Sequence, residues 1–213
     1  MTRHQPVSEE RLEYELEASR FGMWVFLATE VLFFGALFCA FSVYRFLNYQ
    51  AFAEATRHTD LFLGSLNTGV LLTSSLTMAI AVRLAKRERF TACSWALLAT
   101  ALLGAAFLSI KGLEWAHEIK ENLWPGPQFE FPGQDATAAR LFFGLYFCMT
   151  GLHAFHMIFG MAAVLVVAVL AAAGRLDKDN TAVVENTGLY WHFVDIVWIW
   201  LYPLLYLLGR SAR

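Results

Sequence analysis

Five apolar stretches, each long enough to cross a lipid bilayer, take up most of this chain of 213 residues. A membrane-spanning helix needs about 20 predominantly apolar residues. The stretches at 61–82 and 90–110 meet that length without a single charged residue. Hydrophobic residues make up 58% of the sequence and charged residues 16%, a balance that is not typical of a soluble domain. The sequence therefore predicts an integral membrane protein.

The five stretches are expected to be helices, because a segment in lipid must satisfy its backbone hydrogen bonds within itself. The predicted fold is all-α, an integral membrane bundle of five transmembrane helices that forms one domain over residues 21–209. A polar N-terminal segment, residues 1–20, precedes it, and a short tail, residues 210–213, follows. The predicted helices cover residues 21–44, 61–82, 90–114, 141–174 and 187–209.

Basic residues orient this predicted bundle. Five spans place the two termini on opposite sides of the membrane. The cluster RLAKRER at 83–89 falls in a short loop on the N-terminal side, and compact basic loops favour the cytoplasm. We therefore expect a cytoplasmic N-terminus and a C-terminus on the opposite side. The net charge of −2 argues against a nucleic-acid partner.

One glutamate interrupts the first apolar stretch, GMWVFLATEVLFFGALF. Glu30 lies about ten residues into the predicted helix, roughly 15 Å deep at 1.5 Å per residue. A carboxylate at that depth must be neutral or paired, since burial penalises its charged form. Two interpretations stay open: a proton or lipid-headgroup site, or a neutral acid that bonds to a neighbouring helix.

Two histidines share one stripe of the fourth predicted helix, in TGLHAFHMIFG. His153 and His156 are three residues apart, so a metal site is conceivable. The motif holds no adjacent carboxylate, and a histidine pair that hydrogen-bonds a neighbouring helix is the commoner case. Hydrogen-bonded packing is the favoured interpretation, and no metal is expected.

Other polar residues inside the stretches suggest contacts between helices. His192 and Asp195 lie one turn apart in the last stretch and could share a proton or hold a neighbour. Asn67 and Ser74 lie on one face of the second helix, as residues at close helix packing do. Lys111 and Glu114, also one turn apart, suggest a local ion pair.

Motifs of a self-sufficient enzyme do not occur in the sequence. There is no CxxCH for haem attachment, no glycine-rich phosphate loop and no serine in a nucleophile-elbow context. The chain is expected to have no catalytic residues and no active site of its own.

The polar motifs resemble those of subunit III of the haem–copper terminal oxidases, the cytochrome c oxidase subunit III family. The resemblance runs from residue 22 onward. The motifs that carry it are GMWVFLATEVLFFGALF, SLNTGVLLTSS, KGLEW, TGLHAFHMIFG and ENTGLYWHFVDIVWIWLYPLLYL. The chain looks like the five-helix bacterial form, which lacks the first two of seven helices. The implied location is therefore the bacterial plasma membrane.

The resemblance implies a non-catalytic subunit that packs on oxidase subunit I, holds structural phospholipids and supports proton uptake. Haem and copper would reside in the partner subunits I and II, and a fourth subunit is a further expected partner. Glu30 matches the family's membrane-embedded glutamate, and Arg175 is a candidate ligand for a lipid phosphate. Other positions that match the family's motifs are His153, His156, Glu185, Trp191, His192 and Asp195.

Three alternatives remain at this stage. The five-helix pattern also serves quinol oxidases and accessory proteins of nitric oxide reductases. A stand-alone proton or ion transporter would use Glu30, His192 and Asp195, although no internal repeat supports it. A metalloenzyme would use His153 and His156.

Overall fold

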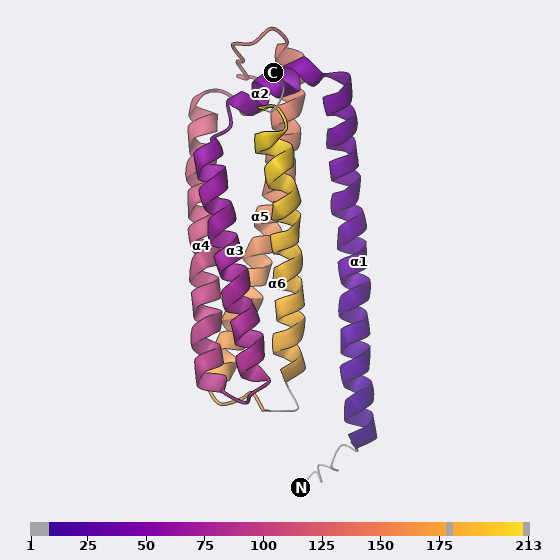
Figure 1. Ribbon diagram of the computed structural model, residues 1–213. Helices are drawn as coiled ribbons and strands as arrows, with labels where there is room; N and C mark the ends of the chain where they lie inside the picture. The colour runs from indigo at the N-terminus through magenta and orange to yellow at the C-terminus, as the bar shows by residue number, and fades with distance from the viewer. Residues whose placement is uncertain (1–8, 178–180, 211–213) are drawn as a thin grey trace.

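Helices make up nearly all of the computed structural model, which describes residues 9–177 and 181–210. In chain order they are α1 (Glu9–Leu47), α2 (Tyr49–Arg57), α3 (Leu61–Ala85), α4 (Phe90–Lys120), α5 (Ala136–Ala172) and α6 (Thr181–Tyr202), followed by the π-helical turn η2 (Pro203–Leu207). The five long helices run side by side, and α2 crosses one end of the bundle (Figure 1). No strand occurs among these residues, so the predicted all-α fold is confirmed.

Four helices in the described part of the chain are long and apolar enough to cross a membrane. They are Glu17–Leu47 within α1 and the whole of α3, α4 and α5. Helix α6 is not among them, because Glu185, His192 and Asp195 interrupt its apolar sequence. It nevertheless runs alongside the other four and contacts α1, α3 and α5 (Figure 1). The chain is therefore an all-α membrane bundle.

The helices extend beyond the apolar stretches that predicted them. Within the expected polar segment 1–20, the described part is already helical from Glu9, and α4 continues past residue 114 to Lys120. A hydropathy boundary marks where lipid contact ends, whereas the backbone hydrogen-bond ladder can continue into water. Helix α5 starts earlier than expected, at Ala136, because the Asp135 side chain accepts a hydrogen bond from the Ala138 amide at 3.0 Å.

The sequence analysis did not anticipate α2, because a nine-residue helix is far too short to span a bilayer. Its buried face includes Ala51, Phe52 and Ala55. The Phe52 ring packs against Phe41 of α1 and Phe142 of α5, with centroids 5.5 and 5.4 Å away. Helix α2 therefore closes one end of the bundle, which we call the α2 end.

Small residues allow a tryptophan of α6 to sit between three helices. Trp191 is fully buried. A Cβ atom added to Gly104 of α4 would lie 2.8 Å from the Trp191 ring, and one added to Gly160 of α5 would lie 3.2 Å from it. The absence of side chains at these two positions lets α4 and α5 approach α6, as is usual between membrane helices.

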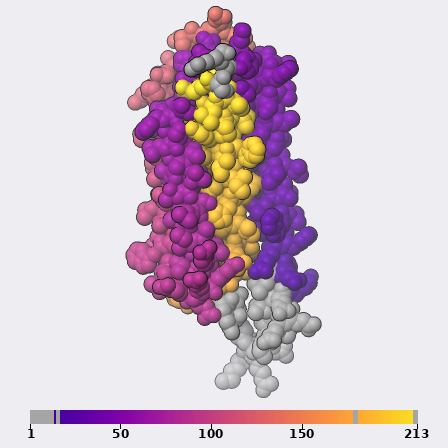
Figure 2. Space-filling model, in the orientation of Figure 1, coloured from indigo at the N-terminus to yellow at the C-terminus, as the bar shows by residue number. Residues whose placement is uncertain are grey.

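Helix α1 stands apart from the compact group formed by α3, α4, α5 and α6 (Figure 1). Its side chains bridge this separation: in the space-filling view the surface of α1 meets that of α6 along most of its length (Figure 2). Helix α1 begins at the end of the bundle opposite to α2, which we call the N-terminal end, and η2 finishes near the α2 end.

We expect Gly104→Ala to destabilise the bundle relative to Gly112→Ala, its matched control in the same helix. Alanine raises helix propensity equally at both positions, but only at Gly104 does the new methyl group meet Trp191, because nothing lies within 4 Å at Gly112. Overpacking of this kind costs about 1–3 kcal/mol. Thermal unfolding midpoints of the two variants in the same detergent measure the difference. Equal midpoints would contradict the packing described here.

Candidate functional site

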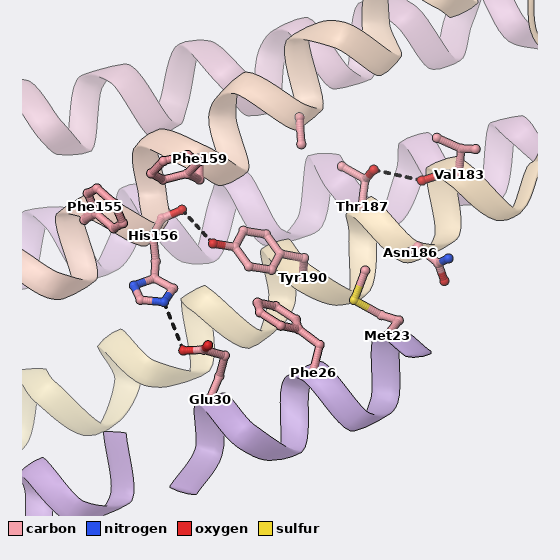
Figure 3. Close-up of a pocket in the computed structure, with 11 residues that line it drawn as sticks. Met23, Phe26, Glu30, Phe155, His156, Phe159, Val183, Asn186, Thr187 and Tyr190 are labelled. Atoms are coloured by element: carbon pink, nitrogen blue, oxygen red, sulfur yellow. Dashed lines mark hydrogen bonds and ion pairs between the residues drawn. The ribbon is translucent and has the colours of Figure 1, made fainter. Parts of the chain in front are cut away.

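A cavity of about 570 Å³ lies where α1 faces α5 and α6. We call it the α1 pocket. Most of its wall is apolar and aromatic, and Figure 3 shows its side chains converging from the three helices. Its lining residues are Met23, Phe26, Glu30, Phe155, His156, Phe159, Ala163, Val183, Asn186, Thr187 and Tyr190. An apolar cavity with a few convergent polar groups is the usual form of a binding site.

Glu30 and His156 form the polar centre of the α1 pocket. The Glu30 Oε2 atom lies 3.0 Å from His156 Nε2, and the two side chains point toward each other from α1 and α5 (Figure 3). The other ring nitrogen, Nδ1, lies 2.8 Å from the Leu152 carbonyl oxygen. The Tyr190 hydroxyl donates to the His156 carbonyl oxygen at 3.1 Å. Three helices are thus joined at this point.

The hydrogen bonds of His156 fix the number of protons in the pair. A carbonyl oxygen can only accept, so Nδ1 carries a proton and donates it to Leu152. The contact between Nε2 and Glu30 then requires one further proton, carried either by the carboxyl or by the imidazole. The net charge of the pair is zero in both cases. This neutrality explains how Glu30 is accommodated near the middle of the apolar part of α1.

Glu185 lies at the N-terminal end, away from the α1 pocket centre. Its carboxylate contacts Arg20 of α1 at 3.1 Å and Lys86, just after α3, at 3.2 Å. Next to it, the Asn186 amide donates to the Ser19 hydroxyl at 2.9 Å. These contacts join the first turns of α6 to α1 and α3. Arg175 follows α5 at the same end and is exposed.

His192 and Asp195 lie on the face of α6 that meets α3. His192 Nδ1 lies 2.8 Å from the Ser75 hydroxyl and 4.0 Å from an Asp195 oxygen. Asp195 is 4% exposed, and neither of its carboxylate oxygens has a hydrogen-bond partner among the described residues. The direct partner of His192 is therefore a serine of α3, which the one-turn spacing in α6 did not indicate.

Asn67 and Ser74 join α3 to α4 and α6. The Trp191 indole donates to the Ser74 hydroxyl at 3.0 Å, and that hydroxyl donates to the Thr100 carbonyl oxygen at 3.5 Å. The Asn67 amide donates to the Phe107 carbonyl oxygen at 3.4 Å. Such bonds between membrane helices typically contribute about 1 kcal/mol each.

His153 takes no part in the α1 pocket, although it lies one turn from His156. It is buried, and its ring packs between Phe107 of α4 and Trp198 of α6, with centroids 5.6 and 5.3 Å away. Neither ring nitrogen has a hydrogen-bond partner within the described segments. The two histidines therefore face different surroundings and do not converge on one point.

A buried ion pair lies between α4, α5 and η2, toward the α2 end. Lys111 Nζ contacts Glu114 Oε2 at 3.0 Å, which is the local ion pair that the sequence suggested. The same ammonium donates to the hydroxyls of Tyr146 at 2.7 Å and Tyr206 at 2.6 Å. Both hydroxyls in turn donate to Glu114 Oε1, at 2.9 and 2.6 Å. We call these four residues the lysine cluster.

A second cavity, of about 510 Å³, opens beside the lysine cluster. We call it the α4 pocket. It is lined mainly by polar and charged side chains: Arg57, His58, Asp60, Leu63, Glu114, His117, Glu118 and Glu121. Glu118 is 2% exposed, and neither carboxylate oxygen has a hydrogen-bond partner in the described part of the chain. It was missed in the sequence, although its spacing from Lys111 and Glu114 places all three on one helix face.

The sequence matches the family described as "Cytochrome c oxidase subunit III" over residues 13–210. A cytochrome c oxidase subunit 3 from Alkalihalophilus pseudofirmus is 30% identical over 207 residues, which cover 96% of this chain and 93% of that protein. A probable quinol oxidase subunit 3 from Staphylococcus saprophyticus is 28% identical over 206 residues, covering 97% of this chain and 96% of that protein.

One relative carries the matching region within a longer chain. A heme-copper oxidase subunit I+III from Aeropyrum pernix is 32% identical over 194 residues. These residues cover 88% of this chain but 22% of that protein.

We expect Lys111→Met to destabilise the protein strongly. The substitution keeps most of the side-chain volume but leaves the Glu114 carboxylate buried without its cation, which costs about 3–5 kcal/mol. Lys120→Met is the matched control, because Lys120 is exposed in the same helix. The fraction of folded protein recovered after membrane extraction and its thermal unfolding midpoint report the effect. A wild-type midpoint for Lys111→Met would contradict it.

Proposed function

The chain belongs to the cytochrome c oxidase subunit III family, and we propose that it is the non-catalytic third subunit of a bacterial haem–copper terminal oxidase. The observation that carries this proposal is the family match over residues 13–210, nearly the whole chain. The relatives named above match over almost their full length in two cases. The role proposed is to stabilise the oxidase and its proton entrance, in the bacterial plasma membrane.

Oxidase subunit I is the principal partner that we propose. The Aeropyrum pernix relative supports it, because its name places subunits I and III in one chain. Two proteins that are fused in one organism commonly form a complex in another. Subunit II and a fourth subunit are further proposed partners, with haem and copper held by subunits I and II.

The electron donor that we propose for the complex is cytochrome c, and quinol is the alternative. A cytochrome c oxidase subunit and a quinol oxidase subunit match this chain at nearly the same identity, 30% and 28%. The motif YWHFVD, which contains Trp191 and His192, favours the cytochrome c branch. The donor itself would bind to other chains of the complex.

The α1 pocket is the proposed site for a structural phospholipid. Its wall is apolar and aromatic, with Phe26 stacked on Tyr190 at a centroid distance of 6.0 Å, so an acyl chain fits its chemistry. The pocket extends from Glu30 toward the N-terminal end, where Asn186 lines it. Arg175, exposed at that end, is the proposed ligand for a lipid phosphate, since guanidinium binds phosphate through two hydrogen bonds.

The Glu30–His156 pair is the proposed contribution to proton uptake. The pair carries one shared proton and can hold it on either residue without a change of net charge. A group of this kind next to subunit I would keep a proton available near its entrance. No chemistry of oxygen reduction is assigned to this pair.

Purification of the tagged protein in mild detergent tests the proposed function. We expect haem and a large many-helix partner to co-purify, detected by a reduced-minus-oxidised visible spectrum and by mass spectrometry. The haem bands and an assay with reduced cytochrome c or quinol then distinguish the two oxidase types. A colourless protein that purifies alone and monodisperse would refute the proposal and favour a stand-alone transporter.

Ala163→Phe tests the lipid site. Ala163 lines the α1 pocket, so a phenyl ring there occupies space that an acyl chain would fill. We expect fewer tightly bound phospholipids per purified complex, counted by mass spectrometry after lipid extraction. Ala162→Phe is the matched control, because Ala162 is exposed on the same helix and does not line the pocket. The same phospholipid count in both variants would exclude the α1 pocket as the site.

A further inference from the structure

We propose that the α4 pocket receives a cationic side chain, lysine or arginine, from a neighbouring subunit, and that Glu118 is its counter-ion. The identity of that neighbour as an oxidase subunit rests on the function proposed above. The pocket itself is independent of the α1 pocket: it lies at the other end of the bundle, where α4 ends and α3 begins.

The lysine cluster cannot satisfy Glu118. An ammonium has three protons, and those of Lys111 go to Glu114, Tyr146 and Tyr206, all within 3.0 Å. Each tyrosine hydroxyl has one proton, and both donate it to Glu114. Every donor of the cluster is therefore used, and the buried Glu118 carboxylate remains without one.

The charges beside the pocket leave one negative charge in excess. Lys111, Glu114 and Glu118 are each 2% exposed and together carry one positive and two negative formal charges. An uncompensated charge in a protein interior costs several kcal/mol. A cation that enters the α4 pocket would remove this imbalance and would face a carboxylate whose two oxygens are both free to accept.

The other carboxylates of the pocket favour a side chain over a metal ion. Asp60 caps α3 by accepting from the Leu63 amide at 3.0 Å, and Glu121 contacts His117 at 3.3 Å. Among the described residues no three His, Cys, Asp or Glu side chains are grouped as a metal ion would need. A guanidinium or ammonium needs only one carboxylate, and a cavity of about 510 Å³ has room for its stem.

The arginine on the rim of the pocket belongs to this chain but does not neutralise Glu118. Arg57 is exposed, and no ion pair joins it to Glu118 within the described segments. Its role is instead backbone contact: its carbonyl oxygen accepts from Arg210 at 3.3 Å. The missing cation must therefore come from outside this chain.

Glu118→Gln in the whole purified complex tests the proposal. The measurement is the ratio of this subunit to haem after washes of increasing salt concentration. We expect the variant to dissociate far more readily than wild type, with a dissociation constant raised roughly thirty-fold or more. Glu118→Asp keeps the charge and should give an intermediate loss. A Glu118→Gln complex as resistant as wild type would overturn the proposal.

Three controls separate the other origins of such a loss. Glu121→Gln removes a half-exposed rim carboxylate and should leave retention unchanged. Arg57→Gln should also do so, and a loss equal to that of Glu118→Gln would assign the cation to this chain. A chelator wash of the wild-type complex should have no effect, whereas a loss with EDTA would indicate a metal ion instead.

The structure of the wild-type complex provides a readout that does not depend on a variant. A lysine or arginine nitrogen of another subunit within about 4 Å of a Glu118 oxygen would support the proposal, and its absence would overturn it. Failure of the proposed function looks different, because then wild-type protein would purify without haem. Haem that co-purifies with an unaffected Glu118→Gln variant refutes the α4 pocket alone.

Discussion

The absence of water from a bilayer is the constraint on which the rest of this structure depends, because every polar group at depth must find its partner within protein. The lysine cluster meets it most fully: the protons of Lys111 and of two tyrosine hydroxyls all go to acceptors inside the cluster. Glu30 meets it by sharing a proton with His156 across two helices. Glu118 does not meet it within the described residues, and for that reason it is the group that points to a partner.

Helix α1 illustrates how polar contacts and apolar space are combined. Hydrogen bonds hold it to the bundle at three depths: Arg20 to Glu185, Glu30 to His156, and Arg45 to the Leu208 carbonyl oxygen. Between these points its packing leaves the α1 pocket and, closer to the α2 end, an apolar groove of about 540 Å³. Attachment by a few polar bonds lets the helix remain in place while leaving space that lipid can fill.

The proposed function uses the two ends of the bundle differently. The α1 pocket lies in apolar surroundings and contains a neutral pair, which suits a lipid chain and a proton. The α4 pocket is mainly polar, contains an unpaired carboxylate and suits a cationic partner. Both proposals describe a protein that stabilises a complex, which agrees with membership of the cytochrome c oxidase subunit III family. Neither requires a reaction at this chain.

The sequence by itself determined the all-α membrane fold, since uninterrupted apolar length admits only a spanning helix. It also predicted the Lys111–Glu114 pair, because residues three apart meet on one helix. Only the tertiary structure decided that Glu30 meets His156, 126 positions away, or that His192 meets Ser75. Helix α2 and the separation of His153 from His156 were likewise decided there. Helical periodicity fixes which residues share a face, whereas the rotation and neighbour of each helix depend on how small and large side chains pack.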